Sequence, residues 1–455
     1  MKLQAPNQSQ VQNALTVFFG MLILCSLAFI NEFPLVYTDT GTYIHSGFRG
    51  DVPIDRTIYY GLFIKHTTYG YSPWLAIFAQ SLLLSGLLFN SFQLIYREKY
   101  SRIVYLVIVG LITATTGISF NASILIPDVF SSICLLSSFI ILYDKDLSKL
   151  KKNLLFVTVA FSLSVHLSHL PILLISLVLL FIIQVFSKNK IGIQPKRIRS
   201  LFLTVLITIL TIPCTNYLLD RTFQLSGGGH VFMLNHLLEI DVLQDYLREN
   251  CTEKNYALCE HVEELNNYEF MWDLQSPLYT AGGWQATKNE YNEINKAILL
   301  NPKYYPKIIT QGLVYSWKQL LTFNSTIDIP QGEGSPPHGL IYWRFNSSET
   351  AYLSSKQNTV GYDLKAFNTL EYGTMLFSIL LLTFVFWSGQ QRNLLTLTVW
   401  ATLFIIVSAI LCSNLSTVNA RYVNRVIWLI PFISFTVLAN IISKQYSLLR
   451  SSQNS

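Results

Sequence analysis

Charged side chains are scarce in this sequence. Asp, Glu, Lys and Arg make up 13% of its 455 residues, whereas a typical soluble domain contains about 25%. The deficit comes from apolar runs of about 20 residues, the length that a helix needs to cross roughly 30 Å of hydrocarbon. The composition therefore excludes an ordinary soluble domain and predicts a protein that spans a membrane several times.

Cysteine is also rare, with six residues in the chain. Four of them are expected to be small buried hydrophobic groups, because they lie inside apolar runs: Cys25, Cys134, Cys214 and Cys412. Cys251 and Cys259 instead lie eight residues apart in a polar region. If that region faces an oxidising compartment, the pair is expected to form a disulfide; otherwise the two thiols stay free.

The apolar runs predict an all-α polytopic membrane protein with about ten transmembrane helices. The first run, at 14–33, lacks a small-x-small cleavage site in the right place, so we expect a retained span and not a signal peptide. The expected spans are 14–33, 73–96, 103–120, 124–143, 154–169, 171–186, 200–219, 370–387, 394–412 and 426–442. They define an N-terminal membrane domain (1–219, with a first outer loop at 34–72), a mostly helical outer region between spans 7 and 8 (220–369) and a C-terminal membrane segment (370–455).

The basic residues fall unevenly on the two sides of this topology. The two termini and the segments at 97–102, 144–152, 188–199 and 392 hold 16 Lys and Arg against 3 Asp and Glu, whereas the rest of the chain holds 16 against 23. Because basic loops stay on the cytoplasmic side, both termini are predicted to be cytoplasmic. The first outer loop and residues 220–369 are predicted to face the other side. The net charge of +6 is then explained by topology and not by nucleic-acid binding.

The first outer loop concentrates groups that can do chemistry. Asp39 lies six residues past the end of span 1, in the sequence Thr-Asp-Thr-Gly-Thr-Tyr. A carboxylate that is partly shielded at a membrane surface is expected to have a raised pKa, which suits a general base. The alternative is structural, with Thr38 or Asp39 capping a short helix that runs through His45.

Asp55 and Arg56 are the second candidates in this loop. Arg56 can hold a phosphate and Asp55 can orient a sugar hydroxyl. Alternatively, the two neighbours form a local ion pair of under about 1 kcal/mol. Asp51 is expected to be structural.

Two other segments place charges at outer ends of spans. Asp128 follows Pro127 at the start of span 4, where an acidic residue either faces a polar cavity or favours the helix N-terminus. Arg421, Tyr422 and Arg425 lie at the outer mouth of span 10, against the positive-inside trend. That placement favours a specific anion such as a lipid phosphate, with interfacial snorkelling as the alternative.

Three histidines are further candidates for substrate binding. His166 and His169 are three residues apart and end span 5 on one helix face. Without a third ligand nearby, a metal site is not expected; contact with phosphate or hydroxyl groups is the functional interpretation. His230 follows three glycines at the start of a predicted helix, whose free N–H groups can cradle a phosphate.

Together these features resemble the C-type glycosyltransferase superfamily, multi-spanning enzymes that use polyprenyl-phosphate sugars. The resemblance is carried by Tyr37 to Tyr43 around Asp39, Asp55-Arg56 followed by Tyr59-Tyr60, Pro127-Asp128, Arg421-Tyr422 and a large outer region late in the chain. It implies inverting transfer of a sugar from a lipid phosphate, with Asp39 as base and Arg421 or Arg425 as phosphate clamp. No Asp-x-Asp stands in the first loop, so a divalent metal is not expected, and no cofactor besides the donor substrate.

We therefore predict a glycosyltransferase of the bacterial plasma membrane. Its expected partners are membrane lipids, a lipid-linked sugar donor and a glycan, lipid or protein acceptor, without nucleic acid. A polysaccharide polymerase or ligase is the alternative enzyme, and its reactive groups would concentrate in residues 220–369. A transporter or flippase is less favoured, because no internal repeat is visible and several spans carry almost no polar groups at mid-membrane.

Overall fold

The computed structural model describes residues 7–96, 100–187, 193–267, 269–327, 330–388 and 392–453. Parts of the basic segments on which the predicted orientation depends lie outside these residues, at 1–6, 97–99 and 188–192. Within the described residues the secondary structure is helical throughout, and the β interactions amount to one isolated bridge between Leu35 and Ile124. The prediction of an all-α fold is confirmed.

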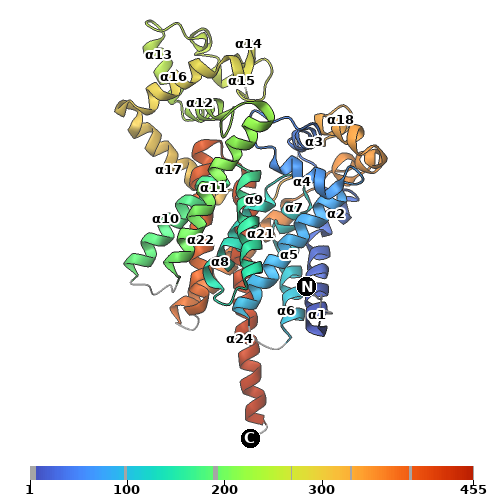
Figure 1. Ribbon diagram of the computed structural model, residues 1–455. Coiled ribbons are helices and arrows are strands. Elements are labelled where there is room, and N and C mark those ends of the chain that lie inside the picture. Colours follow the sequence, from blue (N-terminus) through green and yellow to red (C-terminus); the bar gives the residue numbers. More distant parts are fainter. Residues whose placement is uncertain are drawn as a thin grey trace.

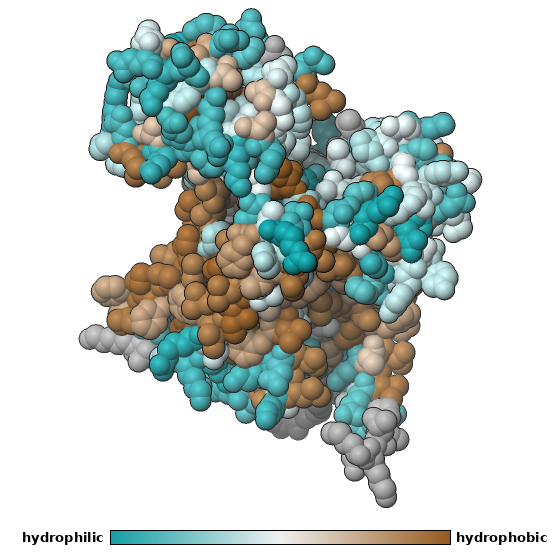
Figure 2. All heavy atoms as spheres, turned by 45° about the horizontal axis from the view of Figure 1, so that its top comes forward, coloured by the Kyte–Doolittle hydropathy of each residue, from teal (hydrophilic) through white to brown (hydrophobic). Residues whose placement is uncertain are grey.

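Six helical stretches are long and apolar enough to cross a membrane. They are α5 (Trp74–Ile95), α10 (His169–Phe186), α11 (Pro195–Asp220), α21 (Lys365–Trp387), the Thr396–Leu415 part of α22 (Arg392–Leu415), and Ala420–Tyr446, which combines α23 (Ala420–Ile427) with α24 (Leu429–Gln453). The shorter apolar helices are α6 (Ser101–Thr115) and α8 (Val129–Tyr143). Figure 2 shows hydrophobic residues forming a broad band across the molecule, with hydrophilic residues above and below it.

Three of the expected spans are interrupted near one end. The first is divided into α1 (Gln8–Leu24) and α2 (Ser26–Asn31), and the third into α6 and α7 (Ile118–Ser123). The fourth starts as extended chain before α8. The break between α1 and α2 is stabilised from α7, where the Ser119 hydroxyl donates to the Leu24 carbonyl oxygen at 2.9 Å and accepts from Leu27 N–H at 3.1 Å. Backbone groups freed at a helix break need such partners inside a membrane protein.

The first outer loop folds into two short helices, α3 (Thr40–Arg49) and α4 (Tyr59–Thr68). Each has a glycine where the two helices cross. A Cβ atom at Gly47 would lie 2.0 Å from the Gly61 carbonyl oxygen, so the backbones are in direct contact and a larger side chain would push the helices apart. α3 and α4 thus form one compact unit, with the loop that carries Asp55 and Arg56 between them.

The outer region at 220–369 divides into two lobes, seen at the top of Figure 1. The cap lobe, residues 229–304, has its own hydrophobic core, and its helices are α12 (Gly229–Glu239), α13 (Val242–Asn250), η1 (Ala257–His261), η2 (Leu265–Asn267), α14 (Pro277–Thr280), α15 (Gly283–Ala286), α16 (Lys288–Leu299) and η3 (Pro302–Tyr304). The helix α17 (Tyr305–Leu321) then returns along α22.

The second lobe, residues 335–360, packs beside α3 and shares the core of the membrane helices. It contains α18 (Pro336–Arg344), η4 (Asn346–Ser348), α19 (Glu349–Leu353) and α20 (Lys356–Thr359). The remaining helix, α9 (Lys149–Val165), packs against α8. The two lobes and the loop between α3 and α4 lie at the same end of the molecule, away from the lower end of α24 (Figure 1).

Candidate active site

Asp39 stands directly before α3. The segment is held by Thr40, whose hydroxyl accepts a hydrogen bond from Tyr37 N–H at 2.9 Å and donates one to the Leu125 carbonyl oxygen at 3.1 Å. The Asp39 side chain makes no capping hydrogen bond to the helix. Its carboxylate is therefore directed to groups from other segments, and the capping interpretation does not describe it.

Three aspartates and three arginines from four segments form an alternating series of contacts, which we name the charge chain. In order it consists of Asp55, Arg56, Asp39, Arg421, Asp128 and Arg425. Asp55 and Arg56 come from the loop between α3 and α4, Asp39 from the start of α3, Asp128 from the start of α8, and both remaining arginines from α23. Segments almost 400 residues apart in sequence thus meet at one point.

In the charge chain Asp39 lies between Arg56 and Arg421. Its carboxylate lies 3.1 Å from Nη1 of Arg56 and 3.5 Å from Nη2 of Arg421. Arg56 also donates from Nε to Asp55 at 3.0 Å. A carboxylate between two guanidinium groups is held in its ionised form and fixed in direction.

The inner part of the charge chain is sealed from solvent. Asp128 lies 2.8 Å from Nε of Arg421 and 3.3 Å from Nη1 of Arg425. The side chains of Asp128 and Arg425 are 1% and 0% exposed, whereas those of Arg421 and Asp39 are 17% and 24% exposed. Buried charges need paired partners. Asp128 and Arg425 therefore form a fixed buried ion pair, and Arg421 extends from it toward the more exposed end of the charge chain.

A cavity of about 360 Å³, the main cavity, opens beside the exposed part of the charge chain. Its polar lining consists of Asp39, Tyr43, Asp55, Arg56, His166, Ser168, Ser226, Ser416, Arg421 and Tyr422. Its apolar lining comes from α10 and the turn before it, from the cap lobe and from α22: Leu167, Pro171, Phe232, Met233, Trp272, Leu411 and Leu415. One cavity therefore offers two guanidinium groups, two carboxylates and an extended apolar surface.

Burial by itself raises the pKa of the Asp39 carboxyl group, but the guanidinium groups of Arg56 and Arg421 lower it by more. The net pKa is below the ordinary value of an aspartate. The predicted raised pKa is therefore wrong, because that prediction took account of shielding from water and not of two arginines, one of them 382 residues away.

His166 belongs to the main cavity. Its Nδ1 accepts a hydrogen bond from Ser168 N–H at 3.3 Å and lies 2.8 Å from the Ser168 hydroxyl. The same hydroxyl accepts from Nη2 of Arg425 at 3.3 Å. The buried Arg425 thus reaches the cavity lining through Ser168 and His166 and does not line it itself.

His169 has a different role from His166. The side chain is buried, with Nε2 at 2.6 Å from the Ser131 hydroxyl and Nδ1 at 2.6 Å from the Ser162 carbonyl oxygen. Both ring nitrogens are therefore used within the helix bundle. His169 joins α8, α9 and α10 and has no nitrogen left for a substrate.

The structure places the other candidate residues as follows. Tyr422 lines the main cavity, with its hydroxyl 3.1 Å from that of Ser416. His230 is buried in the cap lobe, where Nε2 lies 2.7 Å from the Trp284 carbonyl oxygen, and is not part of the cavity lining. Asp51 lies 3.9 Å from His45 at the surface, away from the charge chain.

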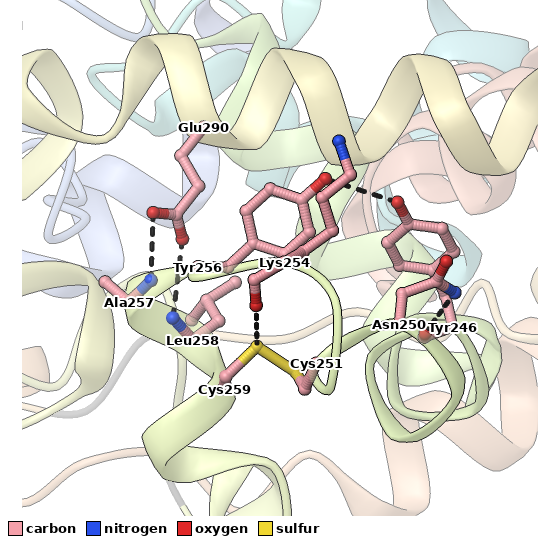
Figure 3. Close-up of a disulfide and its surroundings, with 9 residues drawn as sticks. All are labelled: Tyr246, Asn250, Cys251, Lys254, Tyr256, Ala257, Leu258, Cys259 and Glu290. Atoms are coloured by element: carbon pink, nitrogen blue, oxygen red, sulfur yellow. Dashed lines mark hydrogen bonds between the residues drawn. A yellow bond between two sulfur atoms is a disulfide. The ribbon is translucent and has the colours of Figure 1, made fainter.

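Cys251 and Cys259 are joined by a disulfide in the cap lobe. Figure 3 shows the Glu290 carboxylate beside it, accepting hydrogen bonds from Ala257 N–H and Leu258 N–H. The disulfide and Glu290 hold the segment after α13 against α16. They brace the lobe that supplies part of the apolar side of the main cavity.

A buried network behind α23 was not predicted from the sequence. Glu371 of α21 accepts hydrogen bonds from Gly117 N–H at 2.8 Å, Ser325 N–H at 2.9 Å and the Asn424 amide at 3.0 Å. Asn424 stands between Arg421 and Arg425 on α23, so the network fixes the helix that carries both arginines. An isolated carboxylate in an apolar run was the available signal.

A Glu371→Leu variant is expected to be destabilised by at least about 1–3 kcal/mol, because several buried donors lose their acceptor. Glu371→Gln keeps one acceptor oxygen and should lose less. Thermal unfolding of the purified protein in detergent, followed by tryptophan fluorescence, measures both. The control is Glu333→Leu, the same change at an exposed position. Equal unfolding temperatures for Glu371→Leu and this control would contradict the role assigned to the network.

Among the residues that the structure describes, no group of three or more His, Cys, Asp and Glu side chains is arranged to hold a metal ion. No protein-family model matches the chain, and neither a curated protein nor a solved structure does. The resemblance to C-type glycosyltransferases thus remains a prediction carried by short motifs. The charge chain and the main cavity are the observations on which a functional proposal can rest.

Proposed function

We propose that the protein is an integral membrane glycosyltransferase that moves a sugar, with inversion, from a polyprenyl-phosphate donor to an acceptor on the outer face of the membrane. One observation carries the proposal: two carboxylates and two guanidinium groups face the same cavity as an extended apolar surface. A lipid-linked sugar phosphate has a matching anion, hydroxyl groups and hydrocarbon chain.

The contacts of the charged residues suggest a separate role for each of them. Arg56 and Arg421 line the cavity with guanidinium groups, which are suited to bind a phosphate. The apolar side of the cavity suits the first units of a polyprenyl chain. Asp128 and Arg425, which are buried behind Arg421, set its direction. This geometry favours reactive groups in the first outer loop over the polymerase alternative, which would place them in residues 220–369.

For the membrane topology we propose ten spans with both termini in the cytoplasm of a bacterial cell. The shorter helices α1, α6, α8 and α9 would complete the number, with α2 and α7 extending α1 and α6. The common placement of both lobes and the reactive loop at one end of the molecule supports this arrangement (Figure 1). The outer end would then face the periplasm or the extracellular space.

The chemical step is an in-line displacement. The acceptor hydroxyl gives its proton to Asp39 while its oxygen forms a bond to the anomeric carbon. The bond from that carbon to the phosphate oxygen breaks, and the electron pair leaves with the phosphate. Arg56 and Arg421 stabilise the added negative charge on the lipid phosphate, and attack opposite the leaving group inverts the anomeric configuration.

Donor binding is also expected to activate the base. In the charge chain the two arginines hold Asp39 ionised and lower its basicity. A donor phosphate competes with Asp39 for both guanidinium groups, which weakens their hold on the carboxylate. The pKa of Asp39 should therefore rise when the donor is bound, just when a proton acceptor is needed.

The pH dependence of transfer should reveal this change. The pH dependence of kcat/KM reports the free enzyme, in which the pKa of Asp39 is lowered. As the pH falls, kcat/KM should therefore stay constant through the ordinary pKa range of a carboxyl group, near about 4. It should decline only at lower pH. The acid limb of kcat, which reports the donor-bound enzyme, should lie at higher pH. An acid limb of kcat/KM at or above that of kcat would contradict activation by the donor.

The proposal is tested with the full chain in lipid nanodiscs and a panel of polyprenyl-phosphate hexoses and pentoses labelled in the sugar. We expect at least one donor to release polyprenyl phosphate in the presence of an acceptor fraction from membranes, with an inverted anomeric centre in the product. Nucleotide sugars should not replace it, because they lack the hydrocarbon chain. Failure of every polyprenyl donor, with the protein folded, would overturn the proposed function.

A further inference from the structure

A second cavity, of about 530 Å³, lies in the cap lobe beside the main cavity. Its volume falls in the range of about 300–1,000 Å³ that is usual for small-molecule sites. The side chains that give it its chemistry are Asn235, Glu239, Asp241, Asn266, Glu269 and Trp272. The mechanism described above uses none of the five polar groups.

The two cavities share walls. Trp272 lines both, with 52% of its surface exposed. The helix α12 runs along both, with Phe232 and Met233 at the main cavity and Asn235 and Glu239 at the second. Residues 415–417 also pass from one to the other. A molecule held in the second cavity can therefore extend past Trp272 toward Asp39.

The chemistry of the second cavity is that of hydroxyl recognition. An indole face packs on the apolar face of a sugar ring. Carboxylates accept hydrogen bonds from the hydroxyl groups of the sugar, and side-chain amides both accept from them and donate to them. The Asn235 amide donates to Glu239 at 3.0 Å, which orients that carboxylate. Three carboxylates alone would suit a cation as well as a sugar. The tryptophan and the amides are the groups that favour a sugar.

The two cavities differ in charge. The main cavity is lined by two partly exposed arginines and two aspartates, whereas the described lining of the second contains three carboxylates and no Lys, Arg or His. Lys307 reaches the Asp241 carbonyl oxygen but is paired with Asp245 at 2.6 Å. A phosphate or carboxylate group can thus pair with a guanidinium group in the main cavity, whereas the second cavity offers it no cation and repels it.

We propose that the second cavity binds the acceptor, and that this acceptor is a neutral or amine-bearing sugar and not an anionic one. The inference rests on the proposed function, which requires an acceptor hydroxyl at Asp39. It adds the chemical class of the acceptor and the residues that select it. Glu239 and Glu269 are its specificity-determining residues, and Trp272 positions the acceptor between the cavities.

Binding is measured first without donor, on the full chain in nanodiscs, by saturation-transfer NMR. The probes are methyl glycosides of gluco, galacto and manno configuration, each as the neutral sugar, the amino sugar and the uronic acid. We expect binding of neutral or amino forms at least roughly tenfold tighter than that of the matching uronic acid. A Glu239→Gln/Glu269→Gln variant should reduce this discrimination by roughly tenfold. Trp272→Ala should weaken all forms.

The matched control is Glu263→Gln, which removes an exposed carboxylate of the cap lobe that is paired with Arg248 outside the cavity. It should leave the discrimination unchanged. Equal binding of uronic acids, unchanged discrimination in the double variant, or no binding by any neutral or amino sugar would overturn the inference.

A transfer assay separates the inference from the proposed function. In that assay the double variant should raise the KM for the acceptor and leave the KM for the donor unchanged. If transfer proceeds but the KM for the acceptor is unchanged in the double variant, the second cavity is not the acceptor site, and the proposed glycosyltransferase activity is retained. If the binding results hold but no polyprenyl donor reacts, the second cavity is a sugar site and the proposed reaction fails.

Discussion

An Asp39→Asn variant is expected to transfer sugar at least about 100-fold more slowly than the native protein at saturating donor and acceptor. Asparagine has nearly the same shape as aspartate but cannot accept the proton of the acceptor hydroxyl. The measurement is the initial rate of polyprenyl-phosphate release in nanodiscs. Transfer at a near-native rate would show that Asp39 is not the base.

Donor affinity distinguishes a lost base from a damaged site. In the native protein Asp39 contacts both Arg56 and Arg421, and in the proposed mechanism it competes with the donor phosphate for them. Asparagine carries no charge, so the donor should bind the variant as tightly as the native protein or more tightly, while kcat falls. A variant whose donor affinity falls along with its rate would point to disorder of the arginines instead.

Asp51→Asn supplies the matched control. It is the same chemical change in the same loop, at a carboxylate whose side chain is 68% exposed and whose ionic contact is His45 at 3.9 Å. We expect rates and unfolding temperature close to those of the native protein. The comparison separates the loss of a carboxylate in this loop from the loss of the carboxylate between the two arginines.

The helical character of the fold could be predicted because apolar length is a local property of the sequence. The break at Cys25 could not, because it depends on Ser119, 95 residues beyond the carbonyl group of Leu24 that it satisfies. The two lobes of the outer region were also not predicted. Their separation depends on which apolar residues share a core, with Phe345 and Tyr352 in the membrane core and Tyr291 in that of the cap lobe.

The candidate site shows the same limit. Asp39, Arg56 and Arg421 were recognisable one by one, since each is a charge at the end of an apolar run. Their pairing depends on tertiary contacts that bring α23, packed against α8, to the segment before α3. No local pattern contains those contacts, and for that reason the predicted direction of the Asp39 pKa shift was wrong. His169 and His166 look alike in the sequence, and only their neighbours show that one supports the bundle and the other lines the main cavity.

The largest effect on stability is expected at Asp128. An Asp128→Leu variant removes the carboxylate that neutralises the fully buried Arg425, and it should lose about 3–5 kcal/mol of unfolding free energy. Arg421 is affected less, because it keeps its contact with Asp39 at 3.5 Å. The measurement is reversible unfolding in mixed micelles. The control is Asp144→Leu at the other end of α8, whose partner Lys151 is 41% exposed at 3.8 Å. It should lose less than Asp128→Leu, because Lys151 stays in contact with water when its partner is removed.

A second substitution shows whether the loss comes from the unpaired charge. In Asp128→Leu/Arg425→Met both members of the buried pair become apolar, so the double variant should be more stable than the sum of the single losses predicts. A strictly additive loss, or a single loss no greater than that of Asp144→Leu, would contradict the pairing. Activity should nevertheless stay low in the double variant, because Arg421 has lost the carboxylate that directs it into the main cavity. Recovery of stability without recovery of transfer would show that apolar side chains can replace Asp128 and Arg425 in the fold but not in the active site. The buried end of the charge chain would then serve to orient Arg421.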